Sequence, residues 1–145
     1  MAKGYPDFFG TSIWPKYGTP VYTNSGLIIV PSLGTVNLIS ISGNGVLFSL
    51  DSYLTAAVDF ESSDLFLIVD GAVMVRSVLD PEYLQTSLGG ASPVLGLVIC
   101  SGVDHVLEWM LSREVPFHDS VILRLLNASL GNITTSTYTS HYVVT

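Results

Sequence analysis

Short apolar runs alternate with turn residues along most of this chain, from about residue 21 to its end. The runs are rich in Val, Ile, Leu and Thr, and Gly, Asn, Ser and Pro separate them. This rhythm of short β-branched segments and turn signals is typical of antiparallel β structure. The pattern predicts ten strands, at 26–31, 36–41, 46–51, 54–60, 65–69, 72–78, 94–100, 106–111, 120–127 and 133–144.

Three of the connections between these strands carry turn signals. The dipeptide Asp70-Gly71 is the strongest, because a type I′ hairpin turn needs two residues that tolerate positive φ. Residues 42–45, with the sequence SGNG, supply left-handed positions in the same way. Residues 127–132 are expected to join the last two strands by a similar turn. We therefore expect a hairpin at each of the three places.

Two stretches depart from the strand pattern. Residues 80–85 begin with Asp followed by Pro, which suits the N-cap and first position of a single helical turn. Residues 103–113 also fit a short helix, with Asp104 near its start and Arg113 near its end. We favour a strand for the centre of that stretch, because Pro116 follows and the surrounding pattern is uniformly β.

The last predicted strand is unusually rich in Thr. Alternation places one set of side chains on each of its faces, and one set consists of Ile133, Thr135, Thr137, Thr139, His141 and Val143. Threonine forms strands well but is only weakly hydrophobic. Such a strand suits a sheet with one face exposed or covered by a polar neighbour.

The chain divides into two regions of different texture. Residues 21–145 hold the strands and predict an all-β domain, an antiparallel β-sandwich or a jelly-roll-like fold. Residues 1–20 combine three prolines and three glycines with aromatic side chains, which predicts an irregular N-terminal arm that lies on an apolar surface. The aromatic residues of the arm, which we expect to bind a partner, are Tyr5, Phe8, Phe9, Trp14 and Tyr17. The alternative is that the arm closes the core of its own domain.

Composition narrows the function classes. Only 12% of the residues are charged and 48% are hydrophobic, so we expect neighbouring chains to cover part of the surface. The formal charge of −7 and the five scattered Lys and Arg argue against nucleic acid and against an anionic membrane. No apolar stretch is long enough for a spanning helix and no signal peptide is visible, which predicts a chain made in the cytoplasm. The single cysteine, Cys100, is expected to be a buried apolar residue.

No residue set predicts catalysis or a metal. The histidines His105, His118 and His141 stand far apart, and no nucleophile or nucleotide motif is present. Four acids fall between Asp59 and Asp70, the others being Glu61 and Asp64; we favour a solvated acidic turn over a Ca²⁺ site there. We therefore expect no enzyme, no metal and no cofactor.

Three segments carry a resemblance to a known class of proteins. The opening KGYPDFFGTSIWPKYGT, the central DLFLIVDG, and PFHDSVILRLLN with the Thr-rich strand after it resemble small virion proteins of tailed bacteriophages. The resemblance covers most of the chain by texture and element order, not by a defined motif. It implies a β-sandwich used as capsid decoration, cement or tail adaptor, present in symmetric copies and without catalytic residues.

The leading hypothesis is therefore a non-enzymatic viral structural protein, made in the host cytoplasm and located in the virion. Its partners would be other virion subunits and copies of itself, with no nucleic acid and no membrane. The alternative is a carbohydrate- or receptor-binding β-sandwich, in which Trp14, Trp109 and several tyrosines would form a sugar platform. A small hydrolase or isomerase on a jelly roll is a third hypothesis, for which the sequence shows no residue set.

Overall fold

The protein is a two-layered antiparallel β structure. The computed structural model describes residues 20–57, 60, 63–79, 94–101 and 105–143, without the side chains of residues 96–101. The strands in this part of the chain are β1 (Pro20–Asn24), β2 (Ile28–Val30), β3 (Thr35–Ser42), β4 (Gly45–Ala56), β5 (Asp64–Val69), β6 (Ala72–Val78), β7 (Leu95–Ser101), β8 (Val106–Leu111), β9 (Val115–Phe117), β10 (Ser120–Leu126) and β11 (Ile133–Val143).

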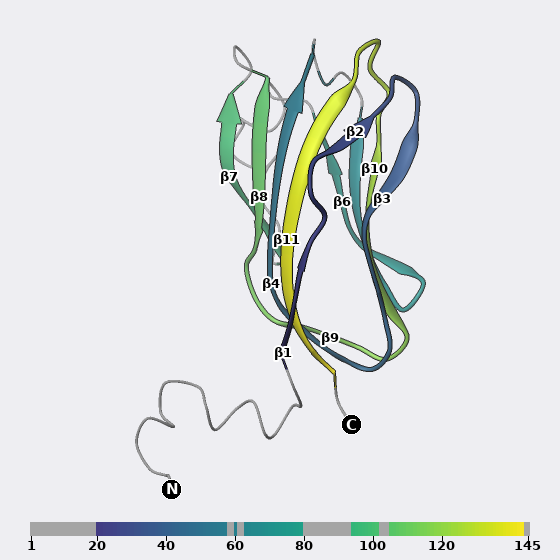
Figure 1. The fold of residues 1–145 in the computed structure, drawn as a ribbon, viewed down its shortest axis with the longest axis vertical. Helices are drawn as coiled ribbons and strands as arrows, with labels where there is room; N and C mark the ends of the chain where they lie inside the picture. The colour runs from purple at the N-terminus through teal and green to yellow at the C-terminus, as the bar shows by residue number, and fades with distance from the viewer. Residues whose placement is uncertain (1–19, 58–59, 61–62, 80–93, 102–104, 144–145) are drawn as a thin grey trace, which may run out of the picture.

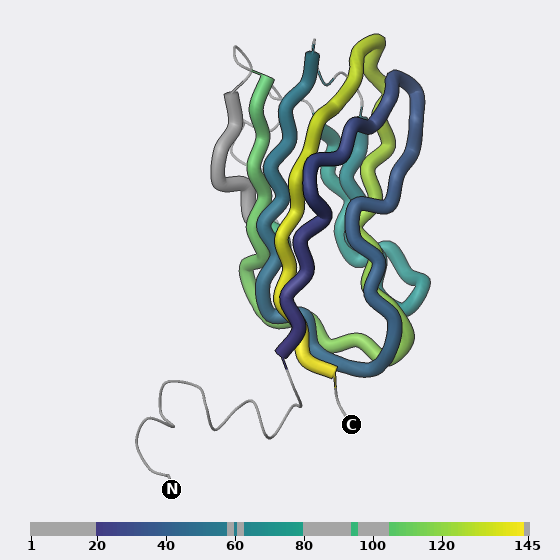
Figure 2. The backbone as a smooth tube through the Cα atoms, viewed as in Figure 1, coloured from purple at the N-terminus to yellow at the C-terminus, as the bar shows by residue number. Residues whose placement is uncertain are grey.

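The strands form two sheets that face each other. Sheet A has the order β1-β11-β4-β8-β7, with β2 also paired to β11 and β9 to β4, and sheet B has the order β3-β10-β5-β6. Figure 1 shows sheet A on the left and the strands of sheet B on the right. The start of β1 and the end of β11 lie at the same end of the sandwich (Figure 2), where Pro20 pairs with Tyr142. The predicted all-β sandwich is confirmed.

The predicted strand boundaries are mostly right, with two corrections. The stretches 46–51 and 54–60, predicted as two strands, form the single strand β4, which ends at Ala56. Ser52 lies fully buried at the predicted break, and its hydroxyl is 3.0 Å from the hydroxyl of Thr137 on β11. That hydrogen bond lets a polar residue continue a core strand, since a buried hydroxyl is tolerated when it has a partner. The short strands β1 and β9 were not predicted.

The Asp70-Gly71 hairpin between β5 and β6 is confirmed. Asp70 has φ 52° and Gly71 has φ 82°, so both residues take the left-handed conformation that the turn requires. The Asp70 carboxylate also accepts hydrogen bonds from the backbone N–H groups of His118, Asp119 and Ser120, at 2.7–3.1 Å. These bonds, that from Asp119 most of all, hold the pKa of Asp70 below its usual value.

The other two predicted hairpins are wrong. Residues 42–45 connect β3 in sheet B to β4 in sheet A, and the loop from 127 to 132 connects β10 in sheet B to β11 in sheet A. Gly43 does take a positive φ, of 117°, so the turn chemistry was read correctly. The same turn residues occur in a hairpin within one sheet and in a connection between two sheets. The turn sequence alone therefore does not distinguish the two kinds of connection.

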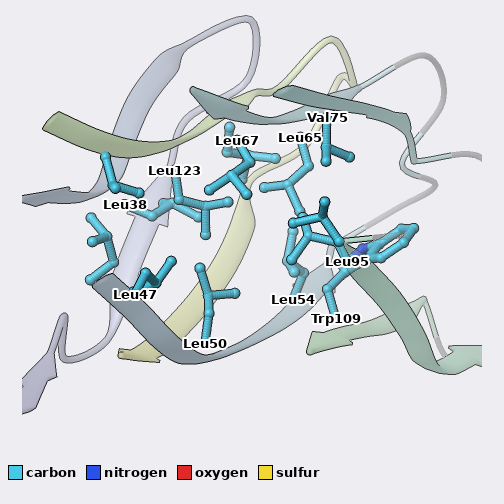
Figure 3. Packing of buried hydrophobic residues seen from close by; sticks show 14 of the residues in the cluster. Leu38, Leu47, Leu50, Leu54, Leu65, Leu67, Val75, Leu95, Trp109 and Leu123 are labelled. Carbon is cyan, nitrogen blue, oxygen red and sulfur yellow. The ribbon is translucent and has the colours of Figure 1, made fainter. Parts of the chain in front are cut away.

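The core fills the space between the sheets with aliphatic side chains. Sheet A contributes Leu47, Leu50 and Leu54 from β4, and sheet B contributes side chains such as Leu65 and Leu123, all at most 2% exposed. Figure 3 shows them meeting between the two layers, with Trp109 and Leu95 toward one side of the cluster. The stretch 106–111 is the strand β8, as favoured, whereas residues 80–85 lie outside the described part of the chain.

The Thr-rich face of β11 points into this core. Thr135, Thr137, Thr139 and His141 are all buried, so the centre of sheet A has a polar inner stripe where a more apolar surface would be usual. The outer face of the same strand carries the exposed Tyr138. The expectation of a sheet with one exposed face is correct, and the buried face is the one that threonine and histidine occupy.

His141 lies inside without a charged neighbour at its paired positions. It pairs with Leu47 on β4 and Val21 on β1, and its ring meets the Phe117 ring edge-on at a centroid distance of 6.3 Å. Its Nδ1 has no hydrogen-bond partner within the described residues. Burial lowers the pKa of His141, because the charged form would lose its hydration.

Candidate interaction surfaces

The predicted binding residues Tyr5, Phe8, Phe9, Trp14 and Tyr17 lie outside the described residues, so their role stays a prediction. The strand that follows them, β1, begins at Pro20 on the edge of sheet A. The sandwich itself presents two further surfaces, which sequence reasoning did not single out.

Asn127 organises one end of the sandwich. It is fully buried, and its amide nitrogen donates to the carbonyl oxygens of Val30, Pro31 and Gly131 at 2.8–3.1 Å. Its amide oxygen accepts hydrogen bonds from the backbone N–H and the hydroxyl of Ser129, at 2.9 and 2.7 Å. One side chain thus fastens the β2–β3 turn to the β10–β11 loop.

That end presents large apolar side chains to solvent. Ile29, Leu33 and Leu130 are 58%, 73% and 81% exposed, and we call these three residues the apolar tip. Figure 1 shows the β2–β3 turn and the β10–β11 loop side by side at the upper end of the sandwich. The hydroxyl of Ser32, next to Leu33, donates to the Ser129 carbonyl at 2.7 Å and ties the two loops together.

Leu33 holds its exposed position at a conformational cost. Its φ is 60°, in the left-handed region that glycine enters freely and that L-residues other than Asn and Asp avoid. The surrounding turn fixes this conformation: Gly34 N–H donates to the Pro31 carbonyl at 2.9 Å, and Asn127 N–H donates to the Gly34 carbonyl at 2.8 Å. A strained residue that also exposes an apolar side chain points to function, because neither property favours folding.

A second surface lies on the outer face of sheet A. In the register of the sheet, Tyr138 on β11 pairs with Asp51 on β4, which in turn pairs with Met110 on β8. One step along the strands, Tyr53 pairs with Glu108. We call these five residues the tyrosine–carboxylate face; Tyr53, Met110 and Tyr138 are exposed, and the two acids are half-buried.

The two acids of this face are diagonal neighbours across β4 and β8. A hydrogen bond with the Asp51 side chain raises the pKa of Glu108, and the negative charge of Asp51 adds to the effect. The Glu108 carboxyl therefore keeps its proton to a higher pH than an isolated glutamic acid does. No Lys or Arg occurs in the described strands of sheet A.

The cations of sheet B are already engaged. Arg76 lies 3.2 Å from the Asp64 carboxylate and 5.9 Å above the Phe66 ring, and Arg124 Nε donates to Asn37 at 2.8 Å. These pairs lie on the outer face of sheet B, whereas the tyrosine–carboxylate face is the outer face of sheet A, so neither Arg76 nor Arg124 pairs with Asp51 or Glu108.

The structure does not bring together the acids that the sequence offered as Ca²⁺ ligands. Asp64 and Asp70 flank β5 at opposite ends and each has its own partners, while Asp59 and Glu61 lie outside the described residues. The described residues hold no group of three or more His, Cys, Asp or Glu that could bind a metal ion.

The proposed sugar platform loses one of its rings. Trp109 is fully buried in the core, so it cannot stack on a sugar. No helix in the described part of the chain is long and apolar enough to cross a bilayer.

Comparisons with known proteins find likeness in fold only. No protein-family model matches the chain, and no curated protein matches its sequence. Among solved structures, it is similar to a chain of the acidic stable capsid of Helicobacter pylori bacteriophage KHP30, with a TM-score of 0.43 and 6% identity over 86% of this chain and 94% of that one. It is also similar to VP2 of the infectious bursal disease virus subviral particle, with a TM-score of 0.28 and 9% identity over 88% of this chain and 42% of that one. Likenesses at this level carry no argument about function.

Proposed function

We propose that the chain is a non-enzymatic structural subunit of a virion, which binds neighbouring protein subunits, copies of itself among them. The single observation that carries the proposal is the apolar tip. Ile29 in β2 and Leu33 and Leu130 in the adjoining loops are exposed to solvent, and the Asn127 side chain hydrogen-bonds to the backbone of both segments. An apolar projection with a hydrogen-bonded backbone suits a protein interface, because little conformational entropy is lost when a partner covers it.

Composition supports the same proposal. With 12% charged residues, the chain carries about half the charge of an average soluble domain. The virion setting comes from the resemblance of the arm, the DLFLIVDG hairpin and the Thr-rich strand to small phage virion proteins. The N-terminal arm adds aromatic anchors, Tyr5, Phe8, Phe9, Trp14 and Tyr17, which we propose contact a neighbouring subunit.

Deletion of residues 1–17 tests the proposal. The truncated chain should keep the circular dichroism and cooperative melting of a folded β domain, and it should no longer associate when measured by light scattering. Failure of the truncated chain to fold would mean that the arm completes its own domain. Unchanged association of a folded truncated chain would remove the arm from the interface.

A further inference from the structure

The tyrosine–carboxylate face combines three features that together indicate which kind of ligand it could bind. Its acids, Asp51 and Glu108, are adjacent, and its rings, Tyr53 and Tyr138, flank them in two rows across β11, β4 and β8. The strands beneath it pair in regular antiparallel register at these residues, so the face is formed by the sheet itself. It is a sheet face that no described element covers, since the described strands of both sheets lie beside it or behind it.

The charges of the face indicate the sign of the charge that its ligand carries. Apart from tyrosines and the buried His141, these two carboxyl groups are the only ionisable acids and bases in six described strands of sheet A. Those strands are β1, β2, β4, β8, β9 and β11. Two like charges held side by side destabilise each other. The hydrogen bond with Asp51 raises the pKa of Glu108 most, and burial and the negative charge of Asp51 raise it further. A cation between them would relieve both, whereas an anionic ligand would add to the repulsion.

The tyrosines narrow the ligand further. Aromatic rings attract cations through their faces, and a planar guanidinium both stacks on a ring and donates two parallel hydrogen bonds to a carboxylate. Tyr138 and Asp51 lie at directly paired positions, as do Tyr53 and Glu108, so each acid has a ring beside it. This arrangement fits arginine best and lysine next.

We propose that the tyrosine–carboxylate face binds a basic peptide segment, rich in arginine or lysine, of a neighbouring protein subunit. The proposal rests on the proposed function, because it assigns one of the contacts through which the subunit would be held. The excess negative charge of the whole chain, −7, also attracts such a segment from a distance.

The test measures binding of a fluorescently labelled oligo-arginine peptide to the full-length chain by anisotropy. The wild-type chain should bind it saturably, and the variant Asp51→Asn/Glu108→Gln should bind it about tenfold more weakly, since each lost contact is a charge-assisted hydrogen bond. Tyr138→Ala should weaken binding about threefold through loss of the cation–π contact. Binding should strengthen as pH rises through the raised pKa of Glu108, because the ionised pair is the form that binds.

The matched control removes the same charge elsewhere. Glu114 and Asp119 are exposed and lie in the β8–β9 and β9–β10 connections, so Glu114→Gln/Asp119→Asn should leave the affinity within about twofold of wild type. Equal losses in both double variants would show a diffuse charge effect and overturn the proposal. Absence of binding would overturn it too, as would a neutral glucan oligosaccharide that binds the face when the peptide does not.

The same samples separate this inference from the proposed function. Their association is measured by sedimentation without peptide. A chain that associates but does not bind the peptide contradicts only the basic-segment proposal. A chain that binds the peptide but stays monomeric contradicts the proposed contacts between copies and leaves the face intact.

Discussion

Replacing Leu33 with Asn should separate folding from assembly. At φ 60° an L-residue other than Gly, Asn or Asp costs roughly 1–2 kcal/mol, and Asn takes this conformation several times more readily than Leu, which recovers about 1 kcal/mol. Leu33 is 73% exposed, so about a quarter of its side chain is buried, and losing that burial costs roughly 0.5 kcal/mol. The free energy of unfolding should therefore rise by about 0.5 kcal/mol.

Urea unfolding measures the stability, and sedimentation velocity measures assembly. The Leu33→Asn chain should unfold at the wild-type midpoint or above it, yet associate more weakly, because the apolar tip has lost one of its three apolar side chains. Leu27→Asn is the folding control: Leu27 is 75% exposed without a positive φ, so its replacement relieves nothing and lowers the midpoint slightly. A loss of more than about 2 kcal/mol in Leu33→Asn would refute the strain argument. Unchanged association would refute the role of the tip.

Three further predictions concern the sandwich itself. Gly45→Ala should destabilise it by about 3 kcal/mol in urea unfolding, because a Cβ there would collide with the Tyr142 backbone carbonyl and come within 3.1 Å of the Phe117 ring. A variant that unfolds at the wild-type midpoint would contradict the β4–β11 register. Gly71→Val should cost roughly 1–3 kcal/mol from backbone conformation alone, since nothing lies within 4 Å of its Cβ position, and an unchanged midpoint would argue against a tight turn. His141 has a pKa in the folded protein below its usual 6.5, so the free energy of unfolding should fall as pH falls below about 6.5, until the lower folded pKa is passed. His141→Phe should flatten that part of the stability–pH profile. An equal slope in both proteins would show that another group causes the effect.

Much of the fold could be predicted because its strands are short apolar or β-branched runs between turn residues. In β10, the apolar run SVILRLL predicts a strand, and in the structure Val121, Leu123 and Leu125 are fully buried while the residues between them are half-buried. The Asp70-Gly71 turn was equally readable, since only a few residue types accept positive φ. Local patterns of this kind depend on neighbours in sequence.

The candidate surfaces depend on neighbours in space, which is why the sequence did not reveal them. Asp51 and Glu108 stand far apart along the chain and meet only because β4 pairs with β8. Asn127 looked like an ordinary turn residue, and its burial and hydrogen bonds alone show that it fastens two loops. Alternation along β4 does place Asp51 and Tyr53 on one face, and that signal was available from the sequence.

Sedimentation velocity of the full-length chain over a wide concentration range tests the central claim most directly. A structural subunit that contacts copies of itself through an apolar tip should sediment as an oligomer, or shift to one as concentration rises, and Leu33→Asn should move that shift to higher concentration. A wild-type chain that sediments as a folded monomer of 15.6 kDa at every concentration would contradict the claim.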